Sequence, residues 1–207
     1  MWIPRNHPYW HVRGILFNNK NIASATLSYY HYIPQSISDD RHTFKIERNN
    51  FLDEHYVAEI LNSGPYESEL AIHSNVQTYT GEEFHIPMID MSTPSRAHLL
   101  KLRPYIGDDS FSSFSWFSSG RSFHGYGSYL VNHAAWTQLM GILLLANQKD
   151  MKPLVDPRWI GHRLLAGYSA LRWTKRTSYY INTPTHIENI YSPNEGIMRD
   201  FQNSRIK

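Results

Sequence analysis

Residues 118–127 read Ser-Ser-Gly-Arg-Ser-Phe-His-Gly-Tyr-Gly, and the fold prediction starts from this stretch. Small residues, one arginine and one histidine stand close together in it. Glycine lets a backbone approach a ligand closely, and the guanidinium of Arg121 can bind two oxygens of one anion. His124 adds a donor that carries full charge only below neutral pH. The stretch therefore predicts an anion-binding turn.

Two acidic segments flank this turn in the chain, residues 85–92 and residues 155–159, and each carries one carboxylate. Asp90 ends an apolar strand-like run, where an unpaired buried carboxylate is costly, so its position favours a site; the alternative is an aspartate that caps the turn after it. Asp156 stands before Pro157, as a helix N-cap does, and a metal ligand there can also cap the helix. The order carboxylate, small-x-His, carboxylate suggests a metal-and-triphosphate site.

Composition limits the class of protein. The 207 residues are 41% hydrophobic, which predicts one folded domain over 1–207. Within it we expect an N-terminal subdomain at 1–65, a core at 66–185 and a loosely held tail at 186–207. The absence of cysteine excludes thiolate zinc sites, iron–sulfur clusters, cysteine nucleophiles and disulfides. A net charge of +2 means that any nucleic-acid surface must be a local patch.

Targeting signals are not visible. The first residues have neither a basic region nor an apolar region of the signal-peptide type. The longest apolar run, residues 140–146, is far shorter than the ~20 residues that span a bilayer. We therefore expect a cytoplasmic protein without membrane contact.

The hydrophobic pattern predicts an α/β chain with antiparallel strands. Residues 1–35 read as strands and loops without a clear period. Helices are expected after the capping residues Asp53 and Asn132, the second over 133–151, and at 157–166 before Gly167. Turn residues 80–83 separate the first two of six expected strands. Five of them are expected at 69–80, 84–91, 98–104, 113–117 and 171–181, and the sixth begins after the turn at Gly120 and is prolonged by 126–130.

Cations with interleaved aromatic residues characterise the second half of the chain. This pattern suits a single nucleic-acid strand or a nucleotide base, because bases stack on aromatic rings. The alternative is an ordinary amphipathic strand and helix with a charged outer face. The residues concerned are Arg158, Arg163, Arg172, Lys175 and Arg176, with Trp159, Tyr168, Trp173, Tyr179 and Tyr180.

These patterns together resemble the archaeo-eukaryotic primase superfamily of primase-polymerases. Its first motif is a pair of acids, represented here by Asp90. Its second is Ser-x-His, matched by residues 122–124, and its third is an apolar residue followed by Asp, matched by residues 155–156. Arg163 and residues 169–173, Ser-Ala-Leu-Arg-Trp, are similar to the family's arginine segment. The resemblance covers about residues 70–180.

The resemblance implies a primase-polymerase-like core, an antiparallel or mixed sheet with flanking helices. It implies that Asp90, His124 and Asp156 form the catalytic set, with Asp90 and Asp156 holding Mg²⁺ or Mn²⁺. Nucleotide phosphates would be bound by Arg121, Ser122, His124, Arg163 and Arg172. The implied partners are a nucleoside triphosphate, a DNA or RNA template, and a helicase or nuclease protein.

One departure from the family pattern matters for activity. The second acid of the first motif is missing, because Met88 and Ser92 stand two residues before and after Asp90. Catalysis with two ions would then require another acid, Glu82, Glu83 or Asp150.

Two other classes of protein stay open. One is a degenerate primase-like module that binds nucleotide or nucleic acid within a larger assembly, without catalysis. The other is a histidine-rich metalloenzyme that uses His73, His85 and His124, although none of these three belongs to a His-x-His or His-x-x-x-His pair.

Overall fold

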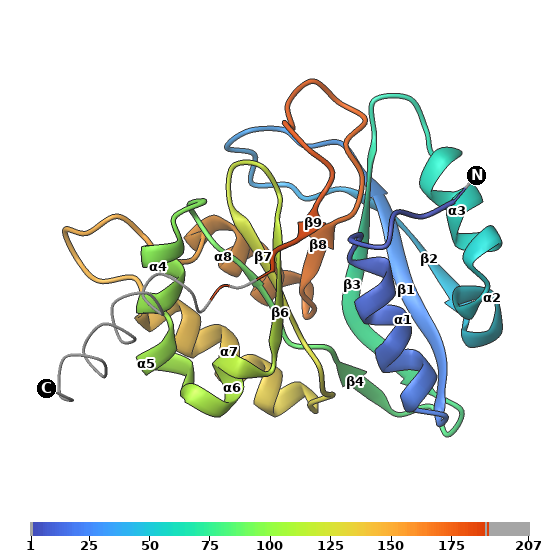
Figure 1. Ribbon diagram of the computed structural model, residues 1–207, viewed down its shortest axis with the longest axis horizontal. Coiled ribbons are helices and arrows are strands. Elements are labelled where there is room, and N and C mark those ends of the chain that lie inside the picture. Colours follow the sequence, from blue (N-terminus) through green and yellow to red (C-terminus); the bar gives the residue numbers. More distant parts are fainter. Residues whose placement is uncertain (1, 189, 191–207) are drawn as a thin grey trace, which may run out of the picture.

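The computed structural model describes residues 2–188 and 190, arranged as two antiparallel sheets with helices around them (Figure 1). The helices are α1 (Tyr9–Asn18), α2 (Arg48–Leu52), α3 (Glu54–Asn62), α4 (Arg96–Lys101), α5 (Arg103–Ile106), α6 (Asp108–Ser112), α7 (His133–Leu145) and α8 (Pro157–Ala166). The strands are β1 (Ile22–Tyr30), β2 (Arg41–Glu47), β3 (Glu69–Thr78), β4 (Glu83–His85), β5 (Met88–Asp90), β6 (Phe114–Ser118), β7 (Phe123–Gly127), β8 (Ala170–Arg172) and β9 (Thr185–His186).

The first sheet has the order β2-β1-β3-β4, and β8 also pairs with β3. The long strand β3 holds it together, because β1 lies along one side while β4 and β8 pair with different ends of the other side. Strand β1 pairs with β3 along nearly its whole length. The segment 1–65, which was expected to be an N-terminal subdomain, and the segment 66–185, expected to be the core, therefore both contribute strands to this sheet.

The second sheet has the order β5-β7-β6-β9. The chain passes into it through residues 86–87, directly after β4. Both link residues are hydrogen-bonded: Ile86 N–H donates to the Ser74 carbonyl of the first sheet, and Gly127 N–H of the second sheet donates to the Pro87 carbonyl, each at 2.8 Å. Helices α4 to α7 lie on the far side of this sheet from α1 (Figure 1), whereas α8 also contacts the first sheet, because Trp159 Nε1 donates to the Ala170 carbonyl of β8.

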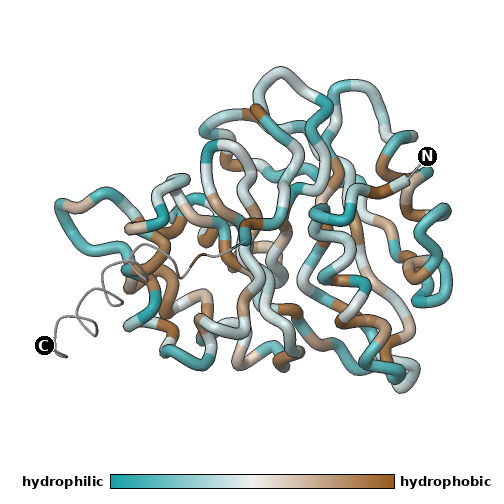
Figure 2. Tube along the Cα trace, viewed as in Figure 1, coloured by the Kyte–Doolittle hydropathy of each residue, from teal (hydrophilic) through white to brown (hydrophobic). Residues whose placement is uncertain are grey.

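Two hydrophobic cores result, and β5 separates them. Met88 packs into the core beneath the first sheet, whereas Ile89 and Met91 pack into the core between the second sheet and the helices. This alternation is the two-residue period of a strand. Figure 2 shows hydrophobic residues along the inner strands and α7, with hydrophilic loops outside.

Several expected elements are confirmed. Asp53 caps α3, Asn132 caps α7, and Gly167 ends α8 in the left-handed conformation. The strand at 69–80 is β3, which pairs with the strand after the turn at 80–83 as expected. The second expected strand is interrupted at residues 86–87, and its two parts, β4 and β5, belong to different sheets.

The prediction of a strand at 98–104 was wrong, because this segment forms α4 and α5. The Ser95 side chain accepts a hydrogen bond from His98 N–H and so caps α4. Leu99 and Leu102 are fully buried three positions apart, which is helical spacing.

Helix α1 was missed within residues 1–35. Its buried side chains recur at helical spacing, at Tyr9, Val12, Ile15 and Leu16. Polar and aromatic residues between them hid this period.

Two other elements are shorter than expected. Helix α7 ends at Leu145, and the amide of Asn147 then binds the backbone of Leu154 and Val155. The expected strand at 171–181 contains only β8. Beyond it, the backbone N–H groups of Arg176 and Thr177 donate to the buried side-chain carboxylate of Glu69 and not to the backbone of a neighbouring strand.

Within residues 2–188 and 190, no helix has the length and apolar character needed to cross a membrane. The tail from residue 191 onward and residue 189 lie outside the described part of the chain.

Candidate active site

Asp90 and His124 stand directly opposite each other on the neighbouring strands β5 and β7. Opposed residues on an antiparallel pair project to the same face, so the two side chains meet. His124 Nε2 lies 3.7 Å from Asp90 Oδ1. The sequence placed these residues 34 positions apart, and strand pairing makes them neighbours.

The turn before β7 supports this pair. Ser122 Oγ donates to Asp90 Oδ1 at 3.2 Å, and Ser119 Oγ lies 2.9 Å from Ser122 Oγ. Gly120 has a φ of 99°, which an L side chain rarely adopts, so the tight turn needs glycine there. A Cβ at Gly125 would lie 2.6 Å from the Trp116 ring, so this glycine makes room for the core and not for a ligand.

A pocket of about 150 Å³ contains Asp90, His124 and Asp156 in its wall. Asp156 reaches it because its backbone N–H donates to the Asp90 carbonyl at 3.0 Å, which places the start of α8 beside the end of β5. Arg163 of α8 and Arg172 of β8 line the same pocket. Four elements, β5, β7, α8 and β8, therefore converge here.

Asp90 has an unusual protonation equilibrium. Its pKa is raised to about 8, first because it is largely withdrawn from water and second because of the negative charge of Asp156. The Ser122 hydrogen bond and Arg172 oppose this rise only partly. The same withdrawal from water lowers the pKa of His124 to about 3, and the positive charge of Arg172 adds to this effect. Both groups are therefore predominantly neutral at pH 7.

Asp156 is the N-cap of α8, as its sequence context predicted. Its Oδ1 accepts hydrogen bonds from Arg158 N–H at 2.8 Å and Trp159 N–H at 3.1 Å. Both cap bonds use the same oxygen, so Oδ2 takes no part in the cap. The capping role and a ligand role are compatible in this geometry.

The two buried arginines keep unpartnered donors. Arg163 pairs with Asp39, but its Nε and Nη1 have no hydrogen-bond partner within the described residues. Arg172 donates to the carbonyls of Ser119 and Asn182 at 3.0 Å each and to that of Thr174, while its Nε has no such partner. Buried donors without partners are costly and favour an anionic ligand.

Arg121 lies apart from these groups. Its side chain is exposed, its guanidinium carbon lies 4.7 Å from the centre of the Tyr179 ring, and it does not line the pocket. Tyr179 in turn packs against Tyr32, with ring centres 4.5 Å apart. Tyr32 lines both this pocket and a larger neighbouring cavity of about 930 Å³.

The acids proposed to complete the first motif do not line the pocket. These acids are Glu82, Glu83 and Asp150. The carboxylate that does reach it is Asp39, from the loop between β1 and β2, and it pairs with Arg41 at 2.8 Å as well as with Arg163. No motif marks this loop, so sequence reasoning missed Asp39.

Ser92, the other candidate position for the missing acid, turns away from the pocket. Its hydroxyl donates to the Pro153 carbonyl, and its backbone N–H donates to the Leu154 carbonyl at 2.9 Å. Met88 is buried in the first core. Neither neighbour of Asp90 on its strand face supplies a second ligand.

The three histidines of the metalloenzyme hypothesis do not meet as a ligand set among the described residues. His73 Nε2 lies 2.7 Å from Ser28 Oγ, and its ring stacks on Tyr168. His124 faces Asp90 instead. His85 has different neighbours, which are described below.

A family model described as archaeo-eukaryotic primase 1D-like matches residues 48–185, about two thirds of the chain. The chain belongs to this archaeo-eukaryotic primase-like family. The match confirms the resemblance and the α+β fold class. It includes Asp90, His124, Asp156, Arg163 and Arg172, but not the pocket residues between Tyr30 and Arg41, Asp39 among them. No curated protein and no solved structure matches the chain significantly.

Proposed function

We propose that the pocket binds a nucleoside triphosphate with Mg²⁺ or Mn²⁺, and that this primase-like chain is a nucleotidyltransferase that acts on nucleic acid. The observation that supports this most is the convergence of Asp90, His124 and Asp156 with two buried arginines on one pocket. Carboxylates beside cationic donors complement a metal–triphosphate complex, which carries both signs of charge.

The donor set fits a hard divalent cation. Asp90 and Asp156 offer oxygen ligands, which Mg²⁺ and Mn²⁺ prefer. Burial raises the pKa of Asp90, and the negative charge of Asp156 adds to this effect in the absence of a cation. These two residues would hold the ion. When bound, it would neutralise charge on the triphosphate and at the leaving oxygen.

The protein groups orient the substrate. Unpartnered N–H groups of Arg163 and Arg172 are available for phosphate oxygens. A phosphate at Arg163 would compete with the carboxylate of Asp39 for the same guanidinium. Ser122 fixes the carboxylate of Asp90 by its hydrogen bond, so its role is to position a ligand.

Nucleic acid would lie in the larger cavity beside the pocket. Tyr32 and Tyr179 line it, and stacked aromatic rings accept bases without regard to sequence. Arg121, which packs on Tyr179, is placed for the nucleic-acid backbone at this edge. A helicase or nuclease partner and a cytoplasmic setting stay predictions.

One observation favours a second function, nucleotide binding without polymerisation. Two carboxylates can hold one ion, whereas activation of the attacking 3′-hydroxyl by a second ion requires more ligands. Ser92 bonds to the Pro153 carbonyl, and Asp39 is paired with two arginines, so neither is free as a third ligand. This arrangement favours weak extension by the isolated chain.

Calorimetry tests the binding function. ATP with Mn²⁺ should bind the wild-type protein, and Asp90→Asn and Asp156→Asn should each weaken binding at least about tenfold, because each removes a charge from the cation site. His124→Ala should also weaken it. Asp53→Asn is the matched control, since Asp53 caps α3 outside the pocket, and it should bind as the wild type does. Absence of binding to the wild type would refute the proposal.

Primer extension separates the two functions. A primed template with nucleotides and Mn²⁺ should show at most weak extension, and Asp90→Asn should abolish it. Robust extension by the wild-type chain would reject the non-catalytic alternative. Triphosphate binding without any extension would reject the transferase and leave a binding module.

A further inference from the structure

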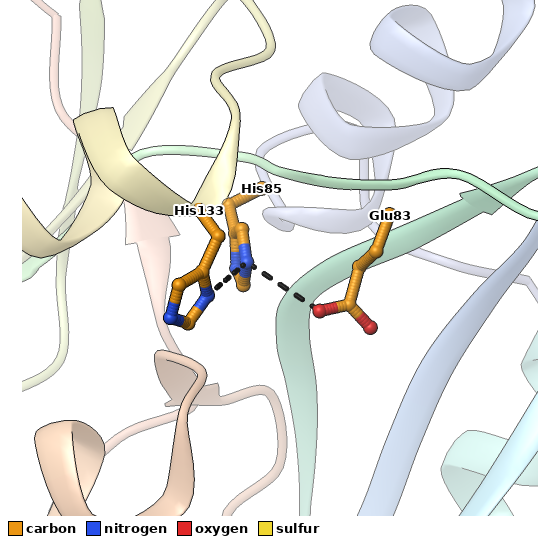
Figure 3. A group of neighbouring side chains, drawn as sticks. All are labelled: Glu83, His85 and His133. Carbon is orange, nitrogen blue, oxygen red and sulfur yellow. Dashed lines mark hydrogen bonds and ion pairs between the residues drawn. The ribbon is translucent and has the colours of Figure 1, made fainter.

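A second cluster of ligand-type side chains lies at the junction of β4 and α7, apart from the pocket. Glu83, His85 and His133 have ligand atoms that all lie within 4.8 Å of one another, and they are the one such group of three among the residues that the structure describes. His85 Nε2 lies 3.3 Å from His133 Nδ1 and 3.6 Å from Glu83 Oε1 (Figure 3). None of the three lines the candidate active site.

We propose that Glu83, His85 and His133 bind a zinc-class divalent transition metal. Two imidazole nitrogens and one carboxylate oxygen are a ligand set that suits Zn²⁺ and leaves a fourth position for water. This donor set differs from the all-oxygen pair in the pocket, which suits Mg²⁺ or Mn²⁺. The two sites would therefore select different ions.

The surroundings of His85 are those of a metal ligand. Its Nδ1 lies 3.0 Å from Ser74 Oγ, so the Nδ1–H tautomer can donate to this hydroxyl and leave the Nε2 lone pair directed at the cluster. The ring is fully buried and stacks on Trp136 with centres 5.0 Å apart, which fixes its orientation. Burial also lowers the pKa of His85 to about 4, so the ring is neutral at pH 7.

The other two ligands are held and accessible. Asn75 Nδ2 donates to Glu83 Oε2 at 3.2 Å, which leaves Oε1 turned towards His85. His133 is the exposed first residue of α7. The positive end of the α7 dipole opposes a cation there, and the Glu83 carboxylate offsets it.

Buried histidines elsewhere in the chain differ from His85. His7 Nε2 bonds to the Trp173 carbonyl at 2.9 Å, and His73 Nε2 lies 2.7 Å from the Ser28 hydroxyl. Each of these nitrogens is satisfied by a neutral group. His85 Nε2 instead faces an imidazole and a carboxylate, and this difference separates a ligand cluster from a satisfied core histidine.

Such an ion would connect two parts of the fold. Glu83 and His85 belong to β4, at the edge of the first sheet, whereas His133 begins a helix that packs on the second core. A bound ion stabilises the folded chain by mass action, since the unfolded chain lacks the preformed site. The ion would fasten β4 to α7.

Zinc binding to the chelator-treated protein tests the proposal. Dialysis with metal analysis should give one zinc per chain beyond any ion in the pocket, and zinc should raise the melting temperature. His133→Ala and Glu83→Gln should each weaken zinc binding at least about tenfold and remove the thermal shift. Cobalt should give visible absorption bands that both variants lose. Both residues are exposed, so neither change should prevent folding, which circular dichroism would verify.

Two controls make the result specific. His55→Ala removes an exposed histidine from the first turn of α3 and should leave zinc binding unchanged. Asp90→Asn alters the pocket and should also leave it unchanged. Zinc binding that survives in both His133→Ala and Glu83→Gln, or a wild-type protein that retains no zinc at micromolar concentration, would overturn the proposal.

Discussion

At the scale of single residues, the pocket contains groups whose environment disfavours their charged forms. Asp90 is only 22% exposed and faces the negative Asp156, while His124 is 6% exposed and faces the positive Arg172. A folded protein that keeps such groups gives up stability at this place, as functional sites commonly do. The sequence indicated both residues through their motifs, but their protonation depends on burial, which only the fold determines.

Asp90→Asn should stabilise the metal-free protein, and more so at higher pH. The raised pKa means that the folded state keeps the Asp90 proton up to about pH 8, whereas the unfolded state releases it near pH 4. The favourable contribution of this proton is complete below pH 4 and is lost as pH rises through 8. Asparagine has no proton to lose and can still accept from Ser122. Its advantage in unfolding free energy should therefore begin near pH 4 and grow by up to about 1.4 kcal/mol per pH unit until about pH 8, so it should be clearly larger at pH 9 than at pH 5.

Urea unfolding with chelator at both pH values measures this difference. An advantage that is the same at pH 5 and pH 9 would mean that the Asp90 carboxyl titrates normally.

At the scale of elements, the start of α8 has two roles that mutation can separate. Asp156 caps the helix through Oδ1, and it lies in the pocket wall. The sequence predicted the cap from Asp-Pro and the helix end from Gly167, because these signals are local. The sequence did not predict the helices α1 and α4. In these segments the spacing of apolar residues is too weak to distinguish a helix from a strand, and tertiary packing decides between them. The sequence did not indicate Asp39, because the loop between β1 and β2 that carries it has no recognisable motif.

Asp156→Ala and Asp156→Asn should differ in stability but not in triphosphate binding. Alanine removes the cap and should lower the unfolding free energy by about 1 kcal/mol, whereas asparagine caps nearly as well. Both remove the charge and should weaken Mn²⁺-dependent binding. Urea denaturation and calorimetry on the same samples measure the two effects. Asp53→Ala, which uncaps α3, should cost similar stability without affecting binding; a binding loss in that variant would attribute the effect to general destabilisation.

At the scale of the whole molecule, two antiparallel sheets share one core, to which Phe117 and Tyr126 of the second sheet contribute, and one site at their junction. The family motifs predicted the α+β class and brought Asp90, His124 and Asp156 into one hypothesis. They did not predict that the chain changes sheet between β4 and β5, because Pro87 is equally compatible with an edge strand or a bulge. The ligand cluster at Glu83, His85 and His133 was also missed, since its spacing in the sequence has no known motif.

The protein should lose stability steeply in mild acid. Burial lowers the pKa of His7 to about 4 and of His73 to about 3, so the folded state keeps them neutral while the unfolded state binds protons below about pH 6.5. Stability therefore falls as pH drops from 6.5 towards 4, by up to about 1.4 kcal/mol per pH unit for each such histidine. Asp90 has the opposite effect, because its raised pKa makes the folded protein more stable as the pH falls. This gain offsets the loss from only one of the two histidines.

Melting temperatures at pH 7 and pH 5 check this expectation. His73→Gln should reduce the difference between them, whereas His55→Gln, at an exposed position, should leave it unchanged. Equal acid sensitivity in the wild type and His73→Gln would contradict the assignment to His73.

The link at residues 86–87 also limits how the two halves can move. Five residue steps join His85 to Asp90, so their Cα atoms lie at most about 18 Å apart however far the chain extends. One end of this tether is hydrogen-bonded to β3 and the other to β7. The two sheets therefore cannot separate without unzipping β4 or pulling Asp90 out of the pocket, and such a separation would also expose the core in which Phe117 and Tyr126 of the second sheet pack.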